Sequence, residues 1–252
     1  MAIYMFNNAA ILLDGLDASG VSNECNVQLS RVELDTTVFP AAGMTHGGAR
    51  SRIGGLVDTK VMASGFVDNS STPAYESTLS AMLGSSAVLS TVAQNGLTYG
   101  NIGYSSSDMG GSYNTFGKVG EVNKFSLEMA GNSVTCRGTV MKVDAGTSTV
   151  TTGSGTATLL GACSASQSVY CQLHVWSVGG SVTPTLTVLV KSSAVIGMTS
   201  PTTRASFTAR TAVGAQRIIV GPAAITDTYY QVTWTASGTS PTFGFAVMVG
   251  IQ

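Results

Sequence analysis

Short runs of alternating apolar and polar residues dominate the C-terminal part of the chain. The clearest runs are residues 185–190, 231–235 and 243–251, where apolar residues recur at every second position. Turn sequences rich in glycine and serine lie between them, at residues 179–180 and 237–241. Because side chains alternate between the two faces of a strand, this pattern predicts short strands with one buried face. Regularly spaced strands of this kind are typical of an antiparallel β-sandwich, either a jelly roll or an immunoglobulin-like fold.

A long alternating run also occurs nearer the N-terminus, at residues 23–39. Its apolar side changes partway, because Val27 and Leu29 share one face whereas Val32 and Leu34 share the other. Such a change predicts a β-bulge or a twisted, partly exposed strand.

A loop and a second strand are predicted next. Residues 40–48 contain one proline, three glycines and mostly small residues, a composition typical of loops, and residues 56–66 return to a strand pattern.

One short amphipathic helix is predicted after this strand. Thr72 can serve as its N-cap, and Pro73 stands at the first helical position, where a missing N–H costs nothing. An apolar stripe with helical spacing follows and ends before Gly84; it consists of Tyr75, Leu79, Met82 and Leu83. We expect this helix to lie on a sheet.

The segment at residues 146–156 is the natural place for a boundary, because it has no charge and Val150 is its one large side chain. We therefore expect a β domain with a long loop and one helix at residues 1–148, a linker at 149–156 and a C-terminal β-sandwich at 157–252. The fold class expected for the whole chain is all-β with one short helix.

Charge is scarce and unevenly distributed. Charged residues make up 10% of the 252 residues, whereas soluble domains commonly have about 25%. Residues 1–150 hold 12 acidic and 8 basic side chains, and the remainder holds 1 acidic and 4 basic ones. The low charge with ordinary apolar content argues against disorder, and the lack of a positive excess argues against a basic nucleic-acid-binding domain.

Few residues are candidates for catalysis or for binding metals. The P-loop, GxSxG, HExxH and GxGxxG patterns are absent from the sequence. The two histidines are His46, in the glycine-rich loop, and His174, which we expect to be a surface or half-buried structural residue. Asp14 and Asp17 flank a turn without the further oxygen ligands of a calcium loop. We therefore expect no enzyme activity, no metal and no cofactor.

The four cysteines and the N-terminus carry no strong signal either. Cys25, Cys136, Cys163 and Cys171 lack CxxC spacing, so buried free thiols are expected rather than a zinc site. The apolar run at residues 9–13 is much shorter than the roughly 20 residues of a membrane helix, so we expect no membrane association.

A set of short motifs in residues 12–68 resembles the tail tube (major tail) proteins of long-tailed bacteriophages. The matching segments are Asp17-Ala18-Ser19-Gly20, Asp35-Thr36-Thr37-Val38-Phe39, Gly55-Leu56 and Gly65-Phe66-Val67-Asp68. Several C-terminal segments, among them Ser200-Pro201-Thr202-Thr203-Arg204 and Gly250-Ile251-Gln252, resemble phage and prophage structural proteins.

The resemblance implies a virion structural protein, assembled in the host cytoplasm, with a β-sandwich or barrel and one flanking helix. Subunits of that family form hexameric rings, stacked into a tube around a channel through which DNA passes during ejection. The expected partners are copies of the chain itself, other tail proteins, and DNA without sequence-specific binding. The added C-terminal domain is expected to face outward. The long loop is then a candidate inter-subunit arm, with candidate residues Phe39, Pro40, Gly43, His46, Arg50, Arg52 and Gly55.

Two other functions stay open at the level of sequence. One is a capsid decoration protein whose C-terminal sandwich clamps the head. The other is a glycan-binding module on the virion surface, with Trp176 and either Tyr229 or Tyr230 as an aromatic platform.

Overall fold

The computed structural model describes residues 9–35, 52–68 and 75–252. The first part of the chain forms β1 (Ala9–Leu13), β2 (Leu16–Asp17), β3 (Ser22–Asp35), β4 (Arg52–Phe66), α1 (Tyr75–Ala81), β5 (Val88–Gln94), β6 (Ile102–Thr115), β7 (Lys124–Gly131) and β8 (Cys136–Thr149). The second part forms β9 (Gly153–Ser154), β10 (Thr158–Leu159), β11 (Val169–Ser193), β12 (Thr202–Ser206), β13 (Gly214–Val220) and β14 (Tyr229–Ile251). The described residues are thus almost entirely β, with one short helix, as the sequence predicts.

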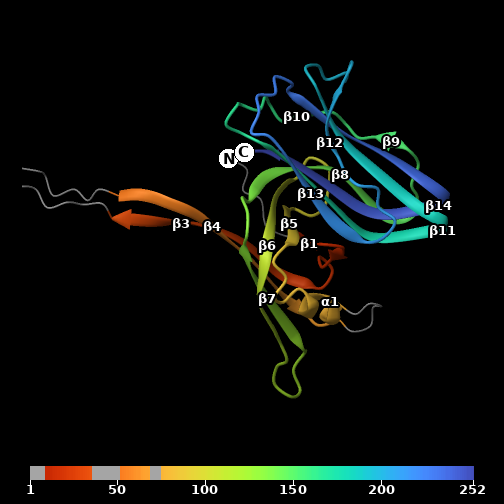
Figure 1. Ribbon diagram of the computed structural model, residues 1–252. Coiled ribbons are helices and arrows are strands. Elements are labelled where there is room, and N and C mark those ends of the chain that lie inside the picture. Colours follow the sequence, from red (N-terminus) through yellow and green to blue (C-terminus); the bar gives the residue numbers. More distant parts are fainter. Residues whose placement is uncertain (1–8, 36–51, 69–74) are drawn as a thin grey trace, which may run out of the picture.

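All the strands belong to one hydrogen-bonded network (Figure 1). Its main path runs β12-β11-β14-β8-β6-β5-β1-β2, and β7 links β6 to the β4–β3 pair. The two parts of the chain meet at β8 and β14, which pair over seven residues of β14 between Thr242 and Val249. The predicted linker at 149–156 takes part in this network, because β9 pairs with β14 and Val150 is buried. The division into two domains stays a prediction.

The C-terminal sandwich is built from two very long strands, β11 and β14, which pair along their whole length from Val169↔Ile251 to Ser193↔Tyr229. Their register shifts three times between Val175 and Thr185. Buried side chains from both halves of β11 belong to a single hydrophobic core, so the β11–β14 pair folds back on itself at these irregular positions. The main members of that core are Leu173, Val175, Leu186, Val188, Val190, Tyr230, Val232, Phe243, Phe245, Val247 and Val249.

The end of β14 is buried on both faces. Phe243, Phe245 and Val247 face the sandwich core, while Ala246 and Met248 on the opposite face are 4% and 2% exposed. Ala246 and Gly250 are small residues of this second face, and they let the first part of the chain pack closely against the strand. A Cβ atom on Gly250 would stand 2.6 Å from the carbonyl oxygen of Arg137, for example.

The first part has its own core beneath α1. Leu79 and Met82 of the predicted helical stripe are buried in it, whereas Leu83 is 43% exposed because the helix ends at Ala81. Thr72 and Pro73 lie outside the described residues. The predicted bulge is confirmed by a register shift between Arg31 and Glu33 in the β3–β4 pair.

Candidate assembly surface

The β3–β4 hairpin projects far beyond the rest of the molecule (Figure 1). Its inner part is supported on one side, because β4 pairs with β7 from Lys60 to Phe66. From Arg52 to Thr59, β4 pairs with β3 alone. Among the described strands β3 has no partner other than β4. The outer hairpin, here called the ribbon (residues 29–35 and 52–59), therefore leaves main-chain groups on both edges unpaired by any described strand.

One face of the ribbon is apolar and runs out of the core. Cys25 and Val27 pack against the core of the first part, and Val61 is buried in it. Further out on the same face, Leu29 is 49% exposed and Val57, which pairs with the exposed Arg31, is 55% exposed. Apolar side chains of this face thus continue into solvent where the core ends, and Arg31 lies beside them.

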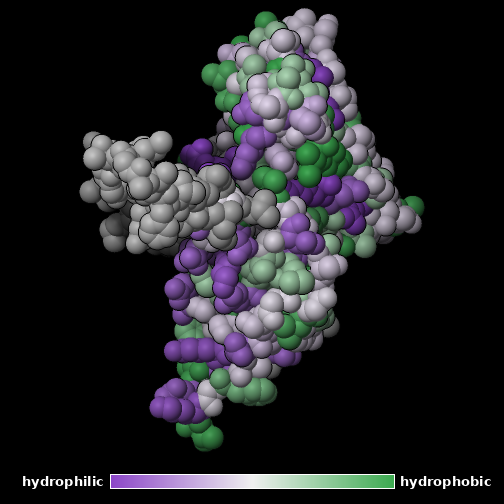
Figure 2. Space-filling view, turned by 60° about the vertical axis from the view of Figure 1, so that its left-hand side comes forward, coloured by the Kyte–Doolittle hydropathy of each residue, from purple (hydrophilic) through white to green (hydrophobic). Residues whose placement is uncertain are grey.

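The opposite face of the inner hairpin, with neighbouring strands β6 and β7, is polar. It has a shallow cavity of about 240 Å³, lined mainly by Glu24, Asn26, Ser64, Ser112, Asn114, Ser126 and Glu128. The Lys60 ammonium donates to Oε1 of Glu128 at 2.8 Å, and this hydrogen bond raises the pKa of Lys60. In Figure 2, hydrophilic side chains extend down the lower half of the molecule.

The turn between β6 and β7 presents a second apolar feature, here called the tip (residues 116–123). Phe116 is 85% exposed, Val119 is fully exposed, and Val122 is 66% exposed. The tip is nevertheless ordered internally, because the N–H of Phe116 donates to Oδ1 of Asn123 at 3.0 Å. Phe116 has a φ of 82°, an unfavourable backbone conformation for a bulky residue. Figure 2 shows the tip at the lower end, where hydrophobic and hydrophilic side chains lie together.

The candidate arm residues from the sequence fall in two groups. Arg52 and Gly55 lie in β4, which begins at Arg52 and not at Leu56 as the sequence pattern indicated. The other candidates lie outside the described residues; they are Phe39, Pro40, Gly43, His46 and Arg50. The contact of this loop with another subunit stays a prediction. Sequence reasoning missed the tip, although three large apolar residues in a glycine-containing loop were a usable signal.

His174 is fully buried, so the prediction of a surface or half-buried residue was wrong. Its Nδ1–H donates to the carbonyl oxygen of Asp14 at 2.8 Å. Nε2 is therefore the acceptor of this neutral ring, and it receives hydrogen bonds of 3.0 Å from Thr91 Oγ1 and Gln172 Nε2. Burial lowers the pKa of His174 to about 4. This histidine joins the first part of the chain to β11 and has no nitrogen left for acid–base chemistry.

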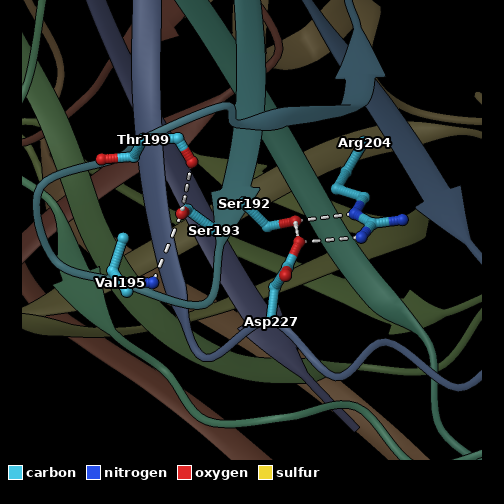
Figure 3. A network of polar contacts seen from close by, with 6 residues as sticks. All are labelled: Ser192, Ser193, Val195, Thr199, Arg204 and Asp227. Carbon is cyan, nitrogen blue, oxygen red and sulfur yellow. Dashed lines mark hydrogen bonds and ion pairs between the residues drawn. The ribbon is translucent and has the colours of Figure 1, made fainter.

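A second polar network lies in the sandwich (Figure 3). Ser192 Oγ donates to Asp227 Oδ2 at 2.6 Å and accepts from Arg204 Nε at 2.7 Å, while Arg204 Nη2 donates to Asp227 Oδ2 at 2.9 Å. These hydrogen bonds lower the pKa of Asp227. Beside it, Ser193 Oγ donates to the carbonyl of Thr199, closing the loop between β11 and β12. The network ties β11 and β12 to the segment that precedes β14.

The structure separates the proposed glycan platform. Tyr230 is fully buried in the sandwich core, so it cannot present its ring to a ligand. Tyr229 pairs with Ser193 at the end of β11, whereas Trp176 lies between Val175 and Ser177, near the fold-back of the strand.

The cysteines are free thiols, with Cys136, Cys163 and Cys171 buried and Cys25 partly buried. The described ranges contain no cluster of three or more metal-binding side chains. They also contain no helix that is both long enough and apolar enough to cross a membrane.

Comparisons with known proteins give only distant structural likenesses. No protein-family model matches the chain, and no curated protein matches it either. A chain from the virion of a native gene transfer agent particle is 14% identical, with 53% of this chain and 97% of that chain covered and a TM-score of 0.40. The SPP1 Dit protein, a hub adsorption protein of phages that infect Gram-positive bacteria, is 13% identical over 97% and 99%, with a TM-score of 0.35. A chain of the phage p2 baseplate is 9% identical over 97% and 98%, with a TM-score of 0.30. Likeness at this level carries no argument about function.

Proposed function

We propose that this chain is a virion structural protein, a subunit of the tail tube of a long-tailed bacteriophage. Copies of it form hexameric rings, and the rings stack around a channel for DNA. The motifs in residues 12–68 support this proposal, and the ribbon is the structural observation that carries it.

The ribbon is an unsupported two-stranded structure. An isolated hairpin is marginally stable in water, and at least one further strand or a covering surface is needed to stabilise it. Both edges of the ribbon offer main-chain N–H and C=O groups, and one face exposes Leu29 and Val57. Exposed edges of this length invite pairing with another chain. A neighbouring copy in the same or an adjacent ring would provide that strand and cover the apolar face.

The polar face of the inner hairpin is proposed as the channel wall. A surface along which DNA slides should not collect uncompensated cations, since these bind phosphates strongly. On this face Lys60 is paired with Glu128, and serine and asparagine side chains make up most of the remainder. The acidic excess of residues 1–150 acts in the same direction.

Electron microscopy of the purified full-length chain tests the proposal directly. We expect sixfold rings and stacked tubes. A matched variant replaces residues 30–58 with Asn-Gly, which closes a tight hairpin between Leu29 and Thr59 and leaves the Thr135–Thr59 hydroxyl contact of 2.8 Å in place. This variant should keep its circular dichroism spectrum and cooperative unfolding but should form no rings.

Three results would overturn parts of the proposal. A wild-type chain that stays monomeric at high concentration would contradict self-assembly. Rings formed by the shortened variant would contradict the role of the ribbon. Antibody labelling of the chain on phage heads would favour the capsid decoration protein.

A further inference from the structure

A cavity of about 530 Å³ lies between the two parts of the chain. The turn that joins β1 to β2 forms one side, α1 forms a second, and residues of β11 and the turn before β13 close the third. This cavity is separate from the polar face and the tip. Nothing in the tube-wall proposal uses it.

Its lining combines aromatic rings with carboxylates. Trp176 and Tyr75 contribute the rings, Asp14 and Asp17 contribute the carboxylates, and all four are partly exposed. Smaller apolar side chains such as Met82 complete the wall, and none of the lining residues is basic. Aromatic faces attract cations, and carboxylates pair with them, so the lining is suited to a positively charged group.

The two carboxylates are held in place but are not fully used. Asp14 Oδ1 accepts from the N–H of Leu89 at 2.8 Å, and Asp17 Oδ1 accepts from the N–H of Ser19 at 3.0 Å. Among the described residues, Oδ2 of Asp14 and of Asp17 has no hydrogen-bond partner. Burial is the main cause that raises the pKa of Asp14, and the charge of Arg210 opposes it. Burial also raises the pKa of Tyr75, with the charge of Asp17 as a smaller cause. A cation that enters the cavity would therefore pair best with Asp17, since Asp14 already has Arg210 nearby.

The cavity is also rigidly built. A Cβ on Gly15 would stand 2.5 Å from the backbone nitrogen of Gly214, so the two turns touch through their main chains. The hydrogen bond of 2.8 Å from His174 Nδ1 to the carbonyl oxygen of Asp14 holds this turn in place. A preformed site of this kind loses little entropy when it takes up a ligand.

The chain itself contains a segment of complementary charge. Residues 36–57 include Arg50 and Arg52 and contain no aspartate or glutamate. This segment follows the end of β3 and runs into β4, so the ribbon carries it. In Figure 1 the ribbon leaves the body on the side away from α1, which favours a second copy as the donor.

We propose that this cavity receives the guanidinium group of Arg50, which belongs to the segment between β3 and β4 of a second copy of the chain. The guanidinium stacks on Trp176 and pairs with Asp17. A planar guanidinium can do both at once, since it stacks on aromatic rings and hydrogen-bonds to carboxylates through its edge. The inference rests on the proposed self-assembly and identifies the docking site of the arm.

Binding of a synthetic peptide provides a test that does not need assembly. The peptide comprises residues 40–52 (PAAGMTHGGARSR), and the protein carries Trp234→Phe, so that Trp176 is the remaining tryptophan of the two in the chain. We expect the peptide to change the fluorescence of Trp176 saturably. Replacing Arg50 of the peptide with alanine should weaken binding by about tenfold, which corresponds to the loss of one such contact.

Variants of the protein locate the contact. Asp17→Asn keeps the side-chain shape and the acceptor for Ser19, and it should weaken binding of the peptide severalfold. Asp144→Asn is the control, since Asp144 pairs with Lys142 at 3.5 Å and does not line the cavity, and it should bind like the parent. Equal affinity for the peptides with and without Arg50, or an unchanged affinity of Asp17→Asn, would overturn the inference.

A charge exchange tests the contact in the full assembly. Arg50→Asp alone should prevent rings or tubes, and adding Asp17→Arg should restore them. If Arg50→Asp assembles normally, the docking site is wrong while the proposed function stands. If the wild-type chain never assembles, the proposed function fails, and the peptide experiment still decides whether the cavity binds the arginine.

Discussion

The C-terminal sandwich and the β3–β4 ribbon are both made of long antiparallel strands, but the sandwich buries its apolar side chains whereas the ribbon leaves them partly exposed. In the sandwich the paired strands β11 and β14 fold back, so Val175 and Leu186 share one core and both are fully buried. The β3–β4 ribbon runs straight out, and Leu29 and Val57 on its apolar face are about half exposed. The same alternation of apolar and polar residues therefore leads to apolar side chains that are buried within the chain in the sandwich, and to apolar side chains that stay half exposed on the β3–β4 ribbon. The second region is therefore where we look for partners.

The largest expected effect compares one aromatic residue from each kind of region. Phe245 is fully buried in the sandwich core, whereas Phe116 at the tip is 85% exposed. Phe245→Ala leaves a cavity and should lower the free energy of unfolding by about 3–5 kcal/mol. Phe116→Ala should change it by no more than about 0.5 kcal/mol. Urea unfolding of both variants checks this, and similar losses for the two would contradict the burial contrast.

Acid should weaken the joint between the two parts of the chain through His174. In the unfolded chain this residue takes up a proton below its ordinary pKa of 6.5, whereas the native state resists protonation down to a pKa of about 4. Stability from this residue is therefore fully present above pH 6.5 and is lost as the pH falls toward 4. The pKa difference corresponds to about 3 kcal/mol at most.

The second histidine of the chain supplies the control for this titration. Unfolding free energies between pH 7 and 4 should fall less steeply in His174→Gln than in the parent, since this variant lacks the side chain whose pKa differs between the native and unfolded states. His46→Gln should keep the steep fall. A parent curve with no loss between pH 6.5 and 4 would be inconsistent with a buried neutral His174.

A smaller effect is expected where β8 meets β14. A Cβ on Gly138 would stand 2.5 Å from the carbonyl oxygen of Val249, so Gly138→Ala should force the two strands apart at a cost of about 1–3 kcal/mol. Gly20→Ala is the matched control, because nothing lies within 4 Å of a Cβ there. Thermal unfolding distinguishes the two, and equal melting temperatures would show that the contact between the parts is looser than the structure indicates.

Local patterns predicted much of the fold. The alternation at residues 243–251 predicted a strand, although both of its faces are buried and it is the end of the 23-residue strand β14, which also includes the predicted turn at 237–241. The change of apolar side in residues 23–39 predicted the bulge beyond Arg31. Both signals depend on neighbours in sequence. The fold-back of β11 and the pairing of β8 with β14 depend on contacts between residues far apart in the chain, and alternation carries no information about them.

The candidate sites show the same division. The burial of His174 could not be predicted, since its surroundings come from Asp14 and Thr91, which are 160 and 83 residues away in sequence. The cavity between the two parts was missed for the same reason. The sequence suggested that Trp176 works together with Tyr229 or Tyr230. In the structure it lines the cavity together with Tyr75 of α1, and this neighbourhood depends on tertiary packing that the sequence pattern does not reveal.

The smallest expected effect on the monomer is also the sharpest test of the ribbon. Leu29→Ser removes an apolar side chain that is 49% exposed, so the free energy of unfolding should change by less than about 1 kcal/mol. If a second copy covers this face, the same substitution removes apolar contact and buries a hydroxyl in the interface, and the protein concentration needed for assembly should rise by about tenfold or more. Ser30→Ala, on the opposite face of β3, is the control and should leave both quantities close to those of the parent. Analytical ultracentrifugation across a concentration series measures the assembly, and chemical unfolding measures the monomer. A large loss of monomer stability without any change in assembly would mean that Leu29 serves the fold of its own chain, and the contrast between ribbon and sandwich would then disappear.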